Sequence, residues 1–253
     1  MTPDQYVESI LAKYAVPRGE GSPAQLFGSV VAGPVRGWAG TQLNALEYSG
    51  SYAKETGVHG VSDVDVLISL KADTKNTLKE LYDSLYLLAQ KQGWSPRHQN
   101  VSVGVTVNGT RGDLVPGKVQ AGYQNYHSLY LRKRDSWTQT NVALHADTVR
   151  ASHRLREIRG VKIWRHLRGL DFPSLYLELF TIQSLSGRSS ATLSENLLHA
   201  LRTLATSLRS SRILDPANTN NVLSDELAQA EKDRIAKLAA QSAAEPNWGN
   251  IVW

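Results

Sequence analysis

The chain has 253 residues, with 28 Lys and Arg against 23 Asp and Glu, a net charge of +5 and no cysteine. This length suits one large domain or two small lobes. The lack of cysteine excludes disulfides, thiolate zinc sites and a thiol nucleophile. No apolar run approaches the ~20 residues that span a bilayer, and the N-terminus lacks the pattern of a signal peptide. We therefore expect a cytoplasmic protein with no membrane partner.

The first fifty residues are predicted to be largely helical. Residues 3–15 place Tyr6, Ile10 and Leu11 on one helical face. Residues 24–47 also carry apolar positions at helical spacing, with an interruption at Gly33-Pro34. We expect two helices there, or one kinked helix.

Residues 49–70 hold the most informative pattern in the chain. The pair Gly50-Ser51 is followed by Asp63 and Asp65, which lie at the start of an apolar run. Strand alternation puts the two carboxylates on one face, where they repel each other unless a cation lies between them. Mg²⁺ binds carboxylates together with substrate phosphates, and the Gly-Ser pair can offer N–H groups and a hydroxyl to phosphate oxygens. The combination indicates nucleoside-triphosphate chemistry, although Asp-x-Asp alone is also typical of a solvated strand edge.

A helix and a β-hairpin are predicted next. Residues 74–92 form an amphipathic helical pattern. The alternating valines of residues 101–107, the dipeptide Asn108-Gly109 and the extended run 110–115 are a strong hairpin signal. We expect Pro116-Gly117 to end the second strand.

Asp113 lies in the second strand of this hairpin. Strand parity puts it on the opposite face from Leu114, so it can face Asp63 and Asp65. Taken alone, Asp113 is also compatible with an ordinary hairpin position.

The motifs Gly50-Ser51, Asp63-x-Asp65 and Asp113-Leu-Val-Pro116 together resemble those of the DNA-polymerase-β-like nucleotidyltransferases. The resemblance is nearest to oligoadenylate synthetase and the bacterial cGAS/DncV-like enzymes (CD-NTases). Lys54-Glu55-Thr56 departs from the Lys-Gly-Thr of many relatives. The resemblance implies that the three aspartates bind two Mg²⁺ or Mn²⁺ ions, which clamp the attacking and leaving oxygens of a phosphoryl transfer.

The second half of the chain changes character. Residues 117–147 interleave aromatic and basic side chains, which suits either nucleic-acid contact or a solvated strand packed by its aromatics. From residue 148 the pattern is helical, with amphipathic segments at residues 150–167, 172–181, 191–210 and 224–243. The C-terminal residues 245–253 carry two tryptophans, and we expect this tail to dock on the chain's own core.

The resemblance also implies nucleotide contacts from the helical half. Lys162 matches a lysine that contacts nucleotide phosphates, Ser174 matches a serine that reaches the triphosphate, and Tyr176 is placed to stack on a base. A solvated basic helix face is the alternative for Lys162.

The predicted fold class is α+β, a two-lobed nucleotidyltransferase fold. Residues 1–147 would form a catalytic lobe with a mixed β-sheet and N-terminal helices, and residues 148–253 a helical lobe. Nucleotides are expected in the cleft between the lobes.

By resemblance, the expected activity is metal-dependent transfer of a nucleotidyl group from an NTP or dNTP to a hydroxyl, with release of pyrophosphate. The implied setting is bacterial anti-phage signalling, with a cyclic oligonucleotide favoured and a downstream effector that binds it. A linear RNA or DNA oligomer, or transfer to an RNA end or a protein, is the alternative. The charge is compatible with long nucleic acid but does not require it. A non-enzymatic nucleotide binder is disfavoured, because it would not need a third carboxylate.

Overall fold

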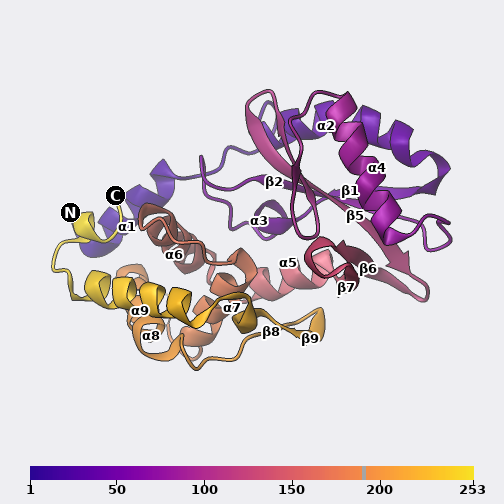
Figure 1. Ribbon diagram of the computed structural model, residues 1–253. Helices are drawn as coiled ribbons and strands as arrows, with labels where there is room; N and C mark the ends of the chain where they lie inside the picture. Colours follow the sequence, from indigo (N-terminus) through magenta and orange to yellow (C-terminus); the bar gives the residue numbers. More distant parts are fainter. Residues whose placement is uncertain (190–191) are drawn as a thin grey trace. The chain divides into compact units, whose positions relative to one another are not determined.

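A computed structural model describes residues 1–189 and 192–253 (Figure 1). The described chain divides into two compact units. The sheet unit comprises residues 17–54 and 62–146, and the helical unit comprises residues 1–16, 55–61 and 147–253. The predicted α+β class is confirmed. The predicted lobe boundary at 147/148 falls beside the junction at 146/147, whereas residues 1–16 and 55–61 group with the helical unit.

The sheet unit is built on a mixed sheet. Within the described residues it has seven strands: β1 (Leu43–Tyr48), β2 (Val64–Leu70), β3 (Arg97–His98), β4 (Val103–Val107), β5 (Thr110–Gln120), β6 (Tyr123–Leu131) and β7 (Ser136–Thr140). The order is β1-β2-β5-β4-β3, and β6 pairs with β5 and β7. Strands β2 and β5 are parallel, whereas the other pairings are antiparallel. The predicted hairpin is β4-β5, with its turn at Asn108-Gly109.

One face of this sheet carries the core of the unit. Alternate residues of β2, including Val66 and Ile68, are buried in one cluster with Phe27 of α2 (Pro23–Ala39) and Leu85 of α4 (Leu78–Lys91). Thr77 caps α4 by accepting a hydrogen bond from the Glu80 backbone N–H. The alternation leaves the polar residues of β2 on the opposite face.

Two predictions about the sheet unit are wrong. Residues 43–47 are strand β1 rather than helix, because helix α2 ends at Ala39, with Gly40 as its C-cap, and the residues from Leu43 onward pair with β2. Strand β5 also continues through Pro116-Gly117 to Gln120. Its pairing with β4 ends at Leu114 and its pairing with β6 begins at Gly117, so Pro116 lies between these two partners.

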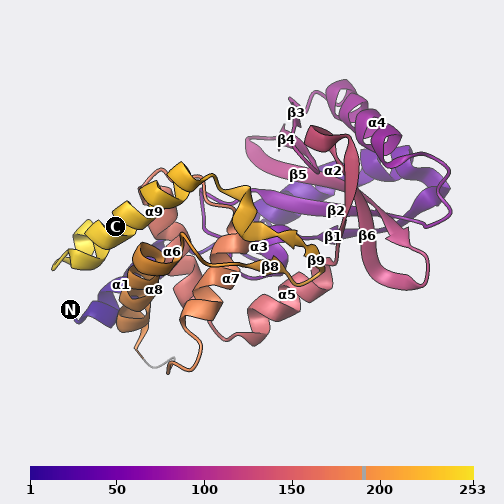
Figure 2. The same cartoon turned by 60° about the horizontal axis from the view of Figure 1, so that its bottom comes forward.

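The helical unit contains α1 (Pro3–Lys13), part of α5 (Val142–Ala151), and α6 (Leu155–Leu167), α7 (Ser174–Ser184), α8 (Leu193–Ser207) and α9 (Gln229–Ala244), with the short pair β8 (Leu214–Asp215) and β9 (Asn218–Val222) (Figure 2). The helix predicted at 150–167 is interrupted near His153, which has a φ of 55°. For the helix predicted at residues 191–210, the predicted first residue, 191, lies outside the described residues. In the part of the chain that the structure describes, no helix is long and apolar enough to span a bilayer.

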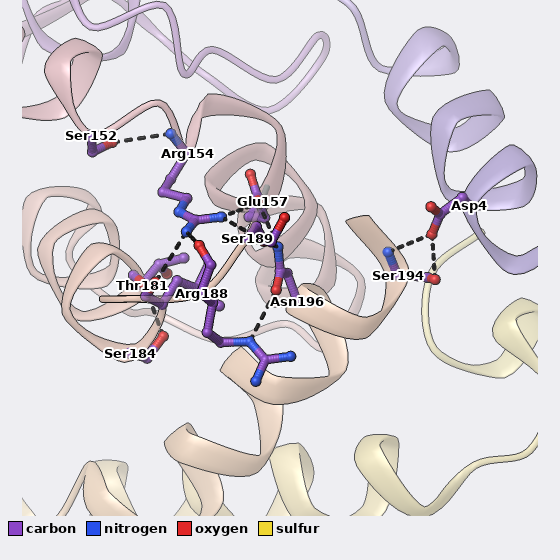
Figure 3. A network of polar contacts seen from close by, with 11 residues as sticks. Asp4, Ser152, Arg154, Glu157, Thr181, Ser184, Arg188, Ser189, Ser194 and Asn196 are labelled. Carbon is purple, nitrogen blue, oxygen red and sulfur yellow. Dashed lines mark hydrogen bonds and ion pairs between the residues drawn. The ribbon is translucent and has the colours of Figure 1, made fainter. Parts of the chain in front are cut away.

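Buried polar groups brace this unit. The Arg154 guanidinium pairs with Glu157 and donates to backbone carbonyls of the segment after α7, including that of Leu185 (Figure 3). The C-terminal tail docks on the same unit, as predicted: Ile251 and Val252 are buried in its core. The Tyr6 hydroxyl donates to the Val252 carbonyl at 3.0 Å.

Candidate active site

The three predicted aspartates converge at one end of the parallel pair β2-β5. Asp65 and Asp113 are direct register partners in this pairing. Asp63 lies two residues before Asp65, so strand alternation points it to the same face. The charges of Asp65 and Asp63 both act on Asp113. The structure therefore brings together the carboxylates that the sequence identified separately.

Gly50 lies directly against this cluster. Its φ is +54°, and a Cβ added at this position would overlap the Asp65 carboxylate, lying 2.5 Å from its Cγ. The Ser49 backbone N–H donates to the Asp65 carbonyl at 2.8 Å, which fixes the Gly50–Ala53 turn (α3) beside β2. Ser51 follows within this turn and is buried. Only glycine meets both the conformation and the close approach required here.

Asp113 lies in a partly desolvated position with polar neighbours. The Gln99 side-chain Nε2 donates to Asp113 Oδ1 at 2.7 Å. Burial is the main cause that raises the pKa of Asp113 to about 7, and the negative charges of Asp65 and Asp63 raise it further. The Arg97 charge and a hydrogen bond from Ser102 oppose the shift.

Asp63 has a different neighbour. Arg111 Nε lies 2.9 Å from Asp63 Oδ1, but the N–H does not point along a hydrogen-bond direction. Arg111 is more than half exposed, so this ion pair contributes little to stability.

The cluster has the chemistry of a divalent-metal site. Its ligands are carboxylate oxygens, which hard cations such as Mg²⁺ and Mn²⁺ prefer. A cation would also relieve the repulsion that raises the pKa of Asp113. In residues 1–189 and 192–253, no three acidic, His or Cys side chains are placed so that they could hold a metal ion as they stand. Metal binding would therefore require side-chain movements, including exchange of the Arg111 partner of Asp63.

Two of the three predicted nucleotide contacts of the helical unit, Lys162 and Tyr176, lie in its interior. Lys162 is 1% exposed and donates to Glu178 Oε1 at 2.7 Å, to Thr56 Oγ1 at 3.1 Å and to the Thr56 carbonyl at 3.2 Å. Tyr176 is fully buried, and burial raises its pKa to about 12. Ser174 is half-buried, and its hydroxyl accepts a hydrogen bond from Arg165.

Sequence reasoning missed the groups that surround Asp113, namely Gln99, Ser102 and Arg97. The hairpin register offered a signal, because a two-residue turn at Asn108-Gly109 places Gly104 opposite Asp113. A Cβ on Gly104 would lie 2.7 Å from Gln99 Nε2. The missing side chain is what allows Gln99 to reach the carboxylate.

Comparisons with known proteins bear on this arrangement. No protein-family model and no curated protein matches the sequence. Among solved structures, CdnC of E. coli MS115-1 in a complex with HORMA-deltaN matches with a TM-score of 0.78 at 20% identity, covering 98% of this chain and 96% of that one. The chain has the CD-NTase fold.

Two further structures agree with this assignment. The CD-NTase CdnG of Bradyrhizobium diazoefficiens, in complex with GTP, matches with a TM-score of 0.74 at 12% identity, covering 94% of this chain and 90% of that one. The CdnE cyclic dinucleotide synthase of Elizabethkingia meningoseptica, with GTP and Apcpp, matches with a TM-score of 0.73 at 13% identity, covering 97% and 100%. The resemblance read from the motifs is thus confirmed at the level of the fold.

Proposed function

We propose that the chain is a metal-dependent nucleotidyltransferase that joins NTPs or dNTPs into a nucleotide signal and releases pyrophosphate. The observation that carries the proposal is the convergence of Asp63, Asp65 and Asp113 beside Gly50. A binding protein would not need to gather three repelling carboxylates at one strand end. The CD-NTase fold adds support, since structures of that fold include a cyclic dinucleotide synthase.

The three aspartates would share the metal ions in this proposal, and Asp113 has an additional role. Asp63, Asp65 and Asp113 bind two Mg²⁺ or Mn²⁺ ions, which when bound supply charge stabilisation for the transferring phosphoryl group. A substrate hydroxyl attacks the α-phosphorus, forming a new O–P bond while the bond to the pyrophosphate leaving group breaks. Asp113 accepts the hydroxyl proton. Gly50-Ser51 contributes backbone N–H groups and a hydroxyl to phosphate oxygens.

The helical unit would supply further nucleotide contacts. We propose that Ser174 binds the triphosphate through its hydroxyl, which now pairs with Arg165. For Lys162 to bind phosphate, it would have to exchange a bond to Glu178 or Thr56. Base stacking on Tyr176 would require exposure of a ring that is buried in the core. In this proposal, residues 1–147 form the catalytic lobe, which also contacts phosphate through Gly50-Ser51, and residues 148–253 form the helical lobe that adds further nucleotide contacts.

We favour a cyclic product because the CdnE structure of this fold is a cyclic dinucleotide synthase. A cyclic nucleotide would act as a second messenger on an effector, which fits anti-phage defence. A linear oligomer remains the alternative, and its free ends give it a different chemical signature.

The test is incubation of the purified chain with each NTP and dNTP, singly and mixed, with Mg²⁺ or Mn²⁺. Products are resolved before and after phosphatase treatment. We expect a compact, phosphatase-resistant product from the wild type and none from Asp63→Asn. Asp83→Asn is the matched control, because Asp83 lies on the exposed face of α4 in a pair with Lys79. A phosphatase-sensitive ladder would indicate linear synthesis, and product from Asp63→Asn would contradict the proposal.

A further inference from the structure

A polar pocket lies on the same face of the sheet as the carboxylates. Its volume is about 410 Å³, and residues of β1, β2, β5, β6 and the start of α5 line it. Leu67 and Ser69 of β2 are among them. Because side chains alternate along a strand, these residues share a face with Asp65. All the lining residues belong to the sheet unit.

A glycine on β5, Gly117, lets the strands around this pocket pack closely. A Cβ on Gly117 would lie 2.8 Å from Leu129 Cδ2, 3.1 Å from His127 Cβ and 3.4 Å from Leu67 Cδ1. The missing side chain lets β6 bring His127 close to β2. The close packing of β2, β5 and β6 therefore shapes the pocket.

Three residues that line the pocket, Asn44, Ser69 and His127, are joined by hydrogen bonds. His127 is 4% exposed, and its Nε2 lies 2.7 Å from Ser69 Oγ. The Asn44 amide donates to the same oxygen at 3.0 Å. The Ser69 hydroxyl has one proton and two lone pairs, so it pairs with Nε2 as donor or as acceptor according to the His127 tautomer.

The His127 ring is almost completely buried. Burial lowers its pKa, and the Glu47 charge and the Asn125 backbone oppose this shift. Nδ1 makes no aligned hydrogen bond within the described residues. A buried ring nitrogen without a well-aligned partner is costly, and a ligand in the pocket could supply a hydrogen-bond partner for Nδ1.

We propose that this pocket binds the base of a nucleotide that reacts at the aspartate cluster, a proposal that rests on the proposed function. The Asn44 and Asn125 side chains can both donate and accept hydrogen bonds, as a base edge requires. The apolar side chains of Leu67, Val119 and Val142 offer contact to a ring face. Four residues of strand separate Ser69 from Asp65, about 13 Å, a separation comparable to the length of a nucleotide.

The charges of the pocket disfavour a phosphate. Its lining includes one acid, Glu47, and one base, Lys71. Phosphate sites gather several donors and positive charges, whereas balanced charges with amides suit a neutral, polar ring. Glu47 accepts hydrogen bonds only, so it would favour a base that presents N–H groups.

The test uses guanosine, adenosine, cytidine and uridine, which carry no phosphate, with the full chain in the absence of metal. Binding is followed by isothermal titration or ligand-observed NMR. We expect at least one nucleoside to bind, and Asn44→Leu to weaken its binding by about tenfold, the effect of one hydrogen bond. Glu47→Gln should change the ranking of the four nucleosides. The matched controls Asn76→Leu and Glu20→Gln alter exposed residues outside the pocket and should bind as the wild type does.

The outcomes separate this proposal from the proposed function. Loss of nucleoside binding in Asn44→Leu, with binding retained in Asp63→Asn, supports the pocket even if no nucleotide product forms. No binding by the wild type, or equal binding by the wild type, Asn44→Leu and Glu47→Gln, overturns the pocket even if product forms. Thermal unfolding of each variant confirms that it is folded, which is expected because Asn44 and Glu47 are exposed.

Discussion

At the scale of single residues, the site depends on how closely Gly50 approaches Asp65. Gly50→Ala would combine an unfavourable positive φ with overlap of the Asp65 carboxylate. We predict that it lowers the free energy of unfolding by more than the roughly 1–3 kcal/mol that backbone strain alone costs, and that it abolishes nucleotidyl transfer. Urea denaturation and product assays measure the two effects.

Gly122→Ala provides the control for Gly50. Gly122 has a φ of +83° and nothing within 4 Å of an added Cβ, so this variant reports backbone strain alone. Equal decreases in the free energy of unfolding in the two variants would show that the overlap with Asp65 does not contribute to the loss of stability.

The raised pKa of Asp113 predicts a pH dependence of stability. The native state retains a proton up to about pH 7 that the unfolded chain releases near the ordinary value of 3.8. Metal-free protein should therefore lose stability as the pH rises from about 4 to about 7, by at most about 1.4 kcal/mol per pH unit.

Asp113→Asn should flatten that pH profile, and Mg²⁺ or Mn²⁺ should restore stability to the wild type near pH 8 but much less to the variant. Urea denaturation at a series of pH values measures both effects. An identical slope in wild type and variant would assign the pH dependence to other groups.

At the scale of elements, local patterns predicted most of what positions the aspartates. The Asn108-Gly109 turn fixed the β4-β5 register, and the apolar alternation after Asp63 identified β2. The helical spacing of Leu43 and Leu46 wrongly predicts a helix where β1 lies. These residues form a strand because they pair with β2, which lies farther along the chain. The direct pairing of Asp65 with Asp113 joins segments almost fifty residues apart, so no local pattern could establish it.

The buried pair of Lys162 and Glu178 links three elements of the helical unit. It joins α6 to α7, and Lys162 also holds Thr56 of the segment that leads from Gly50 to Asp63. We predict that Lys162→Met destabilises the chain by roughly 3–5 kcal/mol, because it leaves a buried carboxylate without its cation. The double variant Lys162→Met/Glu178→Leu should recover most of that loss.

A double-mutant cycle in urea provides the measurement for this pair. Additive losses would contradict a direct charge pairing.

At the scale of the whole molecule, the sequence predicts the fold, but it predicts the division of the chain into two units only in part. Short motifs led to the nucleotidyltransferase fold, which the structure has. The grouping of residues 55–61 with the helical unit depends on tertiary contacts such as Thr56 with Lys162. A seven-residue segment is too short to carry a periodic pattern that would predict the burial of Thr56 and Val58 in that unit.

The central claim is that Asp63, Asp65 and Asp113 form one catalytic metal centre. Its most direct test is the rate of pyrophosphate release from mixed NTPs with Mg²⁺ or Mn²⁺, for the wild type, Asp65→Asn, Asp113→Asn and the surface control Asp83→Asn. We predict that both site variants lose more than the roughly 10- to 100-fold caused by loss of a group outside a ligand shell, and that Asp83→Asn keeps the wild-type rate. Pyrophosphate release by Asp65→Asn or Asp113→Asn at the wild-type rate would contradict the claim.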